Sequence, residues 1–313
     1  MRPNTVVASN RLSYCMDKRQ LGKTDMHVTR LGVGLSEIGF GRVEEQTAAD
    51  VLNTALDAGI NFLDTAECYD VSEELVGKAV SHRRKDFFLA TKTGHVAGGY
   101  VGEEWTAKTV RDSIDRSLKR MKTDYVDLVQ LHSCSVEILE KGDVINVLQE
   151  AKQAGKTRYI GYSGDNAAAT WAVESGLFDT MQTSFNLADQ KARMGLFAKA
   201  KAKGMGIIVK RPIANGAWGA KASPSSYANS YFERSQKMLA LGDIPEAPDN
   251  RILMALGFTL AHDEVDVAIV GTKTPKYMQG NVEMIKQLPI SKTAISELYR
   301  RFEKLGKNWM QLT

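Results

Sequence analysis

The sequence predicts an α/β fold of the (β/α)8, or TIM-barrel, class, and three observations support this. Short apolar runs rich in Val, Ile, Leu or Phe alternate along the chain with segments of helical periodicity. Eight such runs occur in fewer than 300 residues, which is the number of strands and the chain length typical of a closed parallel barrel. No GxGxxG follows the first run and no GxxxxGK[ST] occurs anywhere, which disfavours the alternative, a doubly wound open sheet.

The barrel is preceded by a predicted β-hairpin and built from eight predicted strands. Residues 18–30 have short alternating runs around a turn at residues 22–25, and this hairpin would close the bottom of the barrel. The strands are short and apolar enough to be buried on both faces. They span residues 28–34, 60–64, 87–91, 126–132, 159–163, 180–185, 206–209 and 265–271.

Helical periodicity fills most of the gaps between these strands. The predicted helices span residues 47–58, 106–121, 143–154, 166–174, 193–203, 249–262 and 275–285, and residues 292–307 form an extra C-terminal helix. Gly59, Gly155 and Gly204 follow three of them, as expected for glycines that end helices. Residues 211–248 are the longest irregular stretch. In a barrel, this loop after the seventh strand lies at the C-terminal face, where active sites are built.

Composition indicates one soluble domain over residues 18–313, with residues 1–17 as a loose N-terminal extension. The chain has 313 residues, of which 43% are hydrophobic and 25% are charged. It has no apolar run long enough for a membrane span and no signal-peptide pattern at its start. The three cysteines, Cys15, Cys68 and Cys134, form no CxxC pair, so we expect a cytoplasmic protein without disulfides. A net charge of +4 suits a small anionic ligand and not a nucleic acid.

Ionisable side chains follow three neighbouring strands at the point where each strand ends. Asp64 ends the second strand and Tyr69 follows it, Lys92 lies at the end of the third, and His132 ends the fourth. Strand ends meet at one rim of a barrel, so these four side chains should converge. A buried Lys92 would lower the pKa of the Tyr69 phenol, which would make it a usable general acid. The alternatives are a structural Asp64–Lys92 ion pair and a structural His132.

This set resembles the aldo-keto reductase superfamily, from about residue 18 to the C-terminus. The resemblance rests on Asp64-Thr65-Ala66-Glu67-Cys68-Tyr69, Lys92 and Leu131-His132, and on residues 21–34, 161–163, 182–186 and 271–281. It implies a barrel that binds a nicotinamide dinucleotide in extended form and reversibly reduces a carbonyl to an alcohol. The implied substrate is an aldehyde, a ketone or a sugar.

The resemblance also implies a role for each matching residue. Tyr69 would donate the proton, Lys92 would depress its pKa, Asp64 would hold Lys92, and His132 would orient the carbonyl. Ser163 and Gln182 would bind the nicotinamide carboxamide. The other cofactor residues would be Lys210, Arg211 and Pro212 after the seventh strand, and Gly271, Thr272, Lys273, Tyr277 and Asn281 at the adenosine end.

Three positions depart from the family pattern. Gly164 stands where an Asn often binds the carboxamide, and Lys210 stands where a Tyr often stacks on the nicotinamide. Tyr277 stands where many members have an Arg that binds the 2′-phosphate, and Gly271 stands where they have a nearby Lys. Lys273 can replace them as a point charge, with Tyr277 stacked on adenine. We therefore expect NADPH as the cofactor, with NADH as the alternative.

The sequence leaves other classes of function open. Some superfamily members are cofactor-binding regulatory subunits of channels, with little turnover. A barrel metallohydrolase would use zinc at Cys68, His95, His132 and Cys134, but no His-x-His or CxxC supports a metal site. The basic run at residues 82–85 lacks interleaved aromatic residues, so we expect it to be a solvated surface. We expect a small-molecule partner, without nucleic acid or membrane.

Overall fold

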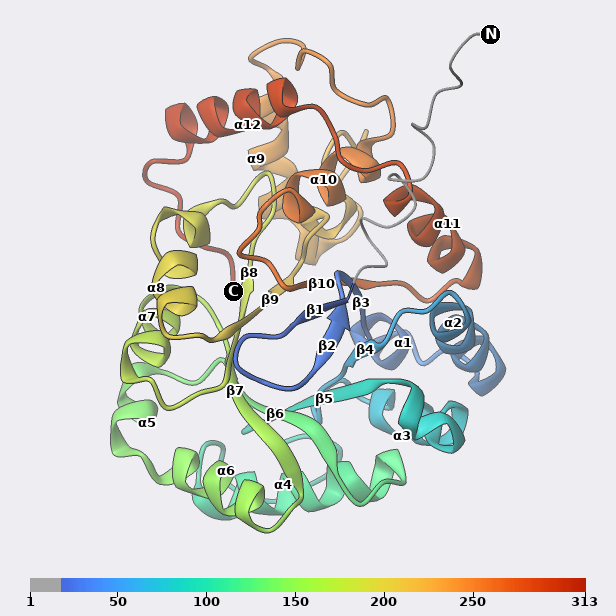
Figure 1. Cartoon of the computed structure of the whole chain (residues 1–313), viewed down its shortest axis with the longest axis vertical. Coiled ribbons are helices and arrows are strands. Elements are labelled where there is room, and N and C mark those ends of the chain that lie inside the picture. Colours follow the sequence, from blue (N-terminus) through green and yellow to red (C-terminus); the bar gives the residue numbers. More distant parts are fainter. Residues whose placement is uncertain (1–17) are drawn as a thin grey trace, which may run out of the picture.

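Eight parallel strands close into a barrel in the computed structural model, which describes residues 18–313 (Figure 1). The barrel strands are β3 (Leu31–Gly34), β4 (Phe62–Asp64), β5 (Phe88–Thr93), β6 (Val126–His132), β7 (Thr157–Ser163), β8 (Thr180–Ser184), β9 (Gly206–Lys210) and β10 (Val267–Gly271). Strand β10 pairs with both β9 and β3 and so closes the ring. The predicted fold class is confirmed. The predicted extension over residues 1–17, and Cys15 within it, lie outside the described residues.

The register of the strands places the polar residues of neighbouring strands beside one another. Lys92 of β5 is opposite Gln130 of β6, and His132 of β6 is opposite Ser163 of β7. Ser163 is in turn opposite Gln182 of β8. Because all strands run the same way, these residues lie at the C-terminal rim of the barrel.

A hairpin closes the opposite end of the barrel, as the sequence predicts. Strands β1 (Lys18–Gln20) and β2 (His27–Thr29) pair antiparallel, and Figure 1 shows them in blue across the middle of the ring. Leu21, Met26 and Val28 are fully buried and pack with barrel side chains such as Phe62 and Leu128. Burial of apolar surface therefore holds the hairpin on the barrel.

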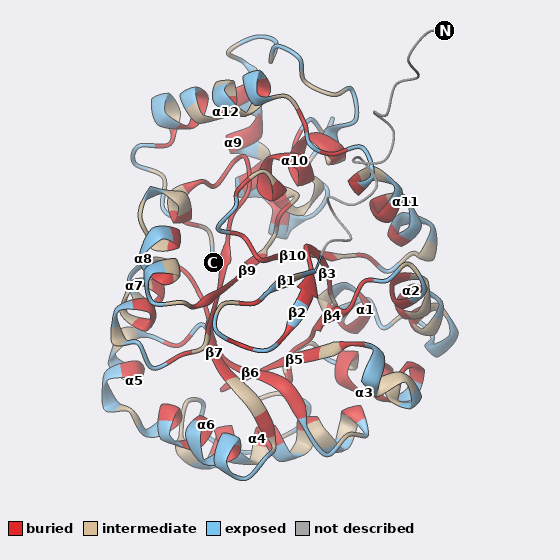
Figure 2. Cartoon of the chain, viewed as in Figure 1, coloured by how far each residue is buried: buried red, intermediate tan, exposed pale blue. Residues whose placement is uncertain are grey.

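Helices surround the barrel and bury the sides that face the strands (Figure 2). They are α2 (Glu45–Asp57), α3 (Ser72–Ala79), α4 (Ala107–Met121), α6 (Asp143–Gln153), α7 (Asn166–Ser175), α8 (Leu196–Ala202), α10 (Arg251–Leu260) and α11 (Pro275–Ile285). Helix α12 (Lys292–Leu305) is the predicted extra C-terminal helix. Gly59, Gly155 and Gly204 adopt positive φ angles after α2, α6 and α8. No helix among residues 18–313 is both long and apolar enough to cross a membrane.

Four helices and one break differ from the sequence prediction. Helix α3 and the short α1 (Ser36–Phe40) and α5 (Val136–Lys141) were not predicted. The stretch 211–248 is not irregular throughout, because α9 (Asn229–Leu239) lies within it and buries Tyr231 and Met238. The helix predicted over 193–203 is broken at Gly195 between the 3₁₀ turn η2 (Lys191–Met194) and α8.

Candidate active site

An ion pair between Asp64 and Lys92 lies at the centre of the rim. Lys92 Nζ is 2.5 Å from Oδ2 of Asp64 and donates to the carbonyl of Thr65 at 2.9 Å. Each of the paired side chains is 1% exposed. Burial alone would lower the pKa of Lys92, but Asp64 and Tyr69 raise it above its usual value. Lys92 is therefore a buried cation at neutral pH.

Two amides complete the surroundings of Asp64. Nε2 of Gln130 donates to Oδ1 of Asp64, and Nε2 of Gln182 donates to Oδ2, each at 3.2 Å. The carboxylate thus has three side-chain donors from three other strands, which fix its position. Gln130 is not among the residues predicted from the sequence. Its place opposite Lys92 depends on the register between β5 and β6, which the sequence does not state.

Tyr69 lies beside Lys92 on the loop after β4. Lys92 Nζ is 4.9 Å from the centroid of the Tyr69 ring. The sequence led us to expect a lowered phenol pKa, but burial raises the pKa of Tyr69, and the opposing effect of Lys92 does not cancel this. The phenol is consequently protonated at neutral pH, and the Lys92 cation lies where it can stabilise negative charge on the phenol oxygen.

His132 faces the same space from the end of β6. Its ring meets that of Tyr69 edge-on, with centroids 5.6 Å apart, and its Nδ1 is 3.3 Å from Sγ of Cys68. Burial and the nearby cations Lys92 and Lys210 hold the pKa of His132 well below its usual value. The imidazole is therefore neutral and offers one donor nitrogen and one acceptor nitrogen.

Aromatic side chains line the approach to these groups. Phe40 packs against Tyr69 at a centroid distance of 5.5 Å, and His95 lies between His132 and Trp105, at 5.3 and 4.9 Å. Gly94 makes this possible, since a Cβ at its φ of +127° would lie 1.9 Å from the Trp105 ring. The rim thus has charged side chains at its centre and aromatic side chains on the side that faces solvent.

The residues predicted to hold a nicotinamide carboxamide have free polar atoms at the rim. Among residues 18–313, Oγ of Ser163 and Oε1 of Gln182 are buried without a hydrogen-bond partner. A buried polar atom without a partner costs free energy, so each of these two atoms can take a hydrogen bond from a bound ligand or an ordered water. A carboxamide carries both a donor and an acceptor, which fits a serine hydroxyl beside an amide oxygen. These residues therefore fit the cofactor.

Lys210 and Arg211 are held by protein groups that the sequence analysis did not identify. Lys210 Nζ is 2.8 Å from Oδ2 of Asp165, and Nη1 of Arg211 donates to Ser184 Oγ at 2.7 Å and to the carbonyl of Leu312 at 2.8 Å. The carbonyl of Pro212 accepts a bond from Thr259. An acid two residues past the end of a barrel strand is the signal that would have singled out Asp165.

The residues predicted for the adenosine end gather where β10 leads into α11. Gly271 ends β10, and Thr272 Oγ1 accepts from the backbone N–H of Thr274 at 3.1 Å. Lys273 is exposed beside Gly41, and Tyr277 is 66% exposed. Asn281, in contrast, is buried on α11. Lys273 and Tyr277 are thus exposed to solvent and open to a ligand, whereas the Asn281 side chain is buried.

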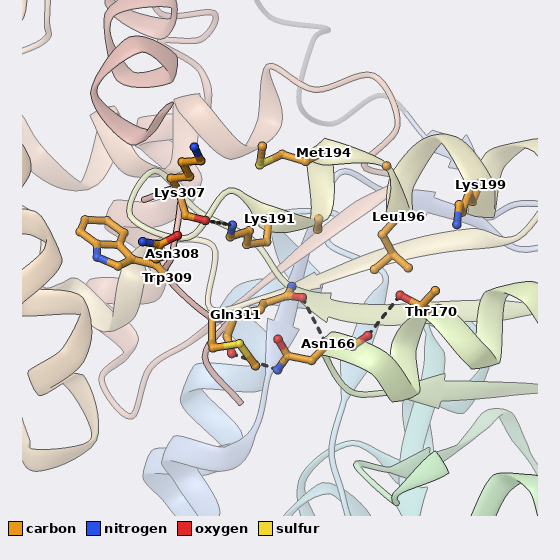
Figure 3. A pocket seen from close by; sticks show the side chains of 13 residues that line it. Asn166, Thr170, Lys191, Met194, Leu196, Lys199, Lys307, Asn308, Trp309 and Gln311 are labelled. Atoms are coloured by element: carbon orange, nitrogen blue, oxygen red, sulfur yellow. Dashed lines mark hydrogen bonds between the residues drawn. The ribbon is translucent and has the colours of Figure 1, made fainter. Parts of the chain in front are cut away.

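A separate cavity of about 490 Å³ lies between α7, η2, α8 and the C-terminal segment (Figure 3). None of Asp64, Tyr69, Lys92 and His132 lines it. Figure 3 shows Gln311 beside Asn166, whose Nδ2 donates to the Gln311 carbonyl at 3.1 Å. Gln311 Nε2 also donates to Thr183 Oγ1, at 2.8 Å, so this segment is anchored to the end of β8. Nothing in the sequence analysis indicated this anchor.

Known proteins are similar to this chain in sequence and in fold. Residues 30–300 match the model of the Aldo/keto reductase family. The chain is 30% identical to L-galactose dehydrogenase of Arabidopsis thaliana, over 87% of this chain and 89% of that protein. It is 30% identical to the oxidoreductase YqkF of Bacillus subtilis, over 90% and 95% of the two chains. The holo structure of aldo-keto reductase AKR11C1 from Bacillus halodurans superposes with a TM-score of 0.77 at 26% identity, covering 91% and 96%.

Proposed function

The chain belongs to the aldo/keto reductase family and is an NAD(P)H-dependent oxidoreductase, and from this we propose that it reversibly reduces an aldehyde, ketone or sugar carbonyl with NADPH and Tyr69 as general acid. The observation that carries the proposal is the buried Lys92, paired with Asp64 and placed 4.9 Å from the Tyr69 ring. An Asp64–Lys92 pair with only a structural role would not require the Tyr69 phenol and the neutral His132 imidazole beside it.

The cofactor is held by residues whose free atoms match it. Ser163 Oγ and Gln182 Oε1, which lack hydrogen-bond partners in the protein, would bind the carboxamide of the nicotinamide. When bound, the nicotinamide supplies or accepts the hydride. Gln182 also donates to Asp64, so one side chain joins the cofactor position to the Asp64–Lys92 pair.

The protein residues move the proton and stabilise charge on the oxygen. Tyr69 gives its hydroxyl proton to the carbonyl oxygen as the carbon gains a hydride, so the product is a neutral alcohol and the enzyme keeps a phenolate. Lys92 stabilises that phenolate, and Asp64 keeps Lys92 charged and in place. The neutral His132 donates a hydrogen bond to the same oxygen. In oxidation, each of these steps runs backwards.

Two further features support the finer parts of the proposal. Exposed Lys273, near the start of α11, is a point charge suited to the 2′-phosphate of NADPH. Aromatic rings at the approach, Phe40 and Trp105, suit the apolar faces of a sugar or an aromatic aldehyde. The name of L-galactose dehydrogenase, a relative of this chain, makes a sugar a sensible substrate to test in the oxidative direction.

The test is turnover of the wild-type chain and of Tyr69→Phe. NADPH oxidation is followed with a reactive aromatic aldehyde, and NADP⁺ reduction with a panel of aldoses. We expect wild-type turnover, and a loss of about 10²–10⁴-fold in Tyr69→Phe with NADPH affinity nearly unchanged. Tyr159→Phe is the matched control, because its hydroxyl bonds to Asp25 in the hairpin at the far end of the barrel. If Tyr69→Phe turned over substrate at the wild-type rate, Tyr69 would not be the general acid. NADPH binding without turnover by the wild type would favour a regulatory role.

A further inference from the structure

We propose that Cys68 is a positioning residue that selects the tautomer of His132. Its thiol donates to Nδ1, so the ring carries its proton on Nε2 and presents that N–H to the substrate oxygen. The catalytic consequence rests on the function proposed above, but the tautomer itself is a property of the folded protein. It can be measured without substrate or turnover.

The geometry brings the thiol to one nitrogen only. Cys68 lies on the loop after β4, immediately before Tyr69, and its Sγ is 3.3 Å from Nδ1 of His132. This is within the range of a hydrogen bond that involves sulfur. In the described part of the chain, Nε2 of His132 has no hydrogen-bond partner. The second ring nitrogen is thus left for a ligand, while the first is occupied by the protein.

The chemistry of the two groups decides which of them donates. Burial raises the pKa of Cys68 to about 12, so the thiol keeps its hydrogen at any physiological pH. The imidazole is neutral, with one nitrogen that donates and one that accepts. A ring nitrogen is a good acceptor and a thiol sulfur a poor one, so S–H to Nδ1 is the favoured arrangement over N–H to sulfur. Nε2 then carries the ring proton.

The alternative tautomer would not serve reduction. With the proton on Nδ1, Nε2 would direct a lone pair at the carbonyl oxygen, which repels it. The thiol also occupies the lone pair that a second proton would need, so it opposes formation of the imidazolium. The other ionisable groups that surround the ring are Tyr69 from the β4 loop, Lys92 of β5, His95 of the β5 loop, and Lys210 and Arg211 at the end of β9. Removal of the thiol leaves these groups in place.

The experiment compares Cys68→Ala, Cys68→Ser and the wild-type full-length chain by nitrogen NMR of isotope-labelled histidine. In the wild type, we expect Nε2 to be protonated and Nδ1 to resonate as a hydrogen-bonded acceptor. In Cys68→Ala, the Nδ1 resonance should shift as the bond is lost, and the pKa of His132 should rise. Serine retains a donor, so Cys68→Ser should restore the wild-type signals. Cys134→Ala is the matched control, since Cys134 is a second free thiol at the same rim, buried on the loop after β6.

Kinetics give a second measure that loss of packing alone would not reproduce. The kcat of Cys68→Ala should fall about three- to tenfold, as for one neutral hydrogen bond, with the KM for NADPH unchanged. The acid limb of its kcat profile should move to higher pH, and Cys68→Ser should restore both. A proton on Nδ1 in the wild type, or an Nδ1 resonance and acid limb that do not change in Cys68→Ala, would overturn the proposal.

The outcomes separate this inference from the proposed function. If the wild type turns over no carbonyl, the proposed reductase activity fails, while the NMR result still decides whether Cys68 bonds to Nδ1. If Cys68→Ala does not fold, the tautomer of the wild type still decides the question, because a proton on Nδ1 there contradicts the proposal.

Discussion

Lys210, the last residue of β9, forms a buried ion pair with Asp165, which lies between β7 and α7, with Nζ 2.8 Å from Oδ2. Asp165 also accepts from Thr183 Oγ1 at 2.9 Å and from the backbone N–H of Ser184 at 2.7 Å. Burial by itself would raise the pKa of Asp165, but Lys210, the Ser184 backbone bond and the nearby Arg211 lower it below its usual value. The pair thus fastens the ends of three strands to one another.

Replacing Asp165 with Asn should destabilise the protein strongly at neutral pH. The change leaves the Lys210 cation buried without its partner, a loss of about 3–5 kcal/mol for such pairs. The carboxylate has a lowered folded-state pKa, so its contribution is present above the unfolded value and disappears as pH falls through the folded value. Urea unfolding should therefore show a large difference from wild type at neutral pH and a smaller one below about pH 4.

The control for this prediction is Asp115→Asn. Asp115 pairs with Lys156 at 2.5 Å, but both side chains are at least one-third exposed. Exposed pairs contribute little, so this variant should unfold close to the wild type at both pH values. An equal loss of stability for Asp165→Asn at neutral and acid pH would show that the ion pair is not its cause.

Asp64→Asn should slow catalysis and shift its alkaline limb. Asparagine keeps the shape of the side chain and still accepts from Gln130 or Gln182, but it removes the charge that raises the pKa of Lys92. Lys92 should then lose its proton at lower pH, so the alkaline limb of kcat should move down. We expect kcat to fall about 10²-fold with NADPH affinity within a few-fold of wild type. An unchanged pH profile would show that Asp64 does not act through Lys92.

Lys273 should determine the preference for NADPH over NADH. It is exposed beside Gly41, where β10 leads into α11, and an ammonium there can meet a 2′-phosphate. Lys273→Ala should therefore weaken NADPH by about tenfold and leave NADH nearly unchanged, measured as dissociation constants by fluorescence. Lys276→Ala, a second exposed lysine three residues further on, should change neither. Equal weakening of both cofactors would assign the 2′-phosphate to other residues.

The sequence predicts the barrel and the four residues at its rim for the same reason. Apolar runs reveal buried parallel strands, and parallel strands bring their C-terminal ends together, so Asp64, Lys92 and His132 converge without further information. Helix α3 escapes prediction because it is short and buries Ser72 and Glu73 as well as apolar residues, which obscures its periodicity.

The hydrophobic pattern of the sequence does not show which distant residues make contact. It also does not show whether burial or a nearby charge decides the direction of a pKa shift. The partners of Asp165 come from β8 and β9, and the anchor of Gln311 comes from β8, so both depend on the closed ring. The pKa of Tyr69 was expected to fall because Lys92 is near, and it rises because burial outweighs that cation. Proximity can be inferred from strand order, whereas the degree of burial requires the packed structure.

Glu67 should make the stability of the protein fall as the pH rises from acid to neutral. Its carboxylate accepts from the backbone N–H of Gly94 at 2.7 Å and from Ser113, and lies 3.4 Å from Arg116. Burial nonetheless raises the pKa of Glu67 from about 4.5 to about 7. The folded state then binds more protons than the unfolded state in this window, so the free energy of unfolding decreases with rising pH there.

Glu67→Gln should remove this dependence, because the amide keeps an acceptor for Gly94 and does not ionise. Urea unfolding should be measured between about pH 4.5 and pH 8. The free energy of unfolding of the variant, relative to that of the wild type, should rise across this range by about 1–3 kcal/mol. Glu74→Gln changes a half-exposed carboxylate on the nearby helix α3 and should leave the pH dependence as it is in the wild type. If wild type and Glu67→Gln kept a constant difference across this range, Glu67 would be ionised throughout. The Arg116 guanidinium would then outweigh the burial that raises the pKa of this carboxyl.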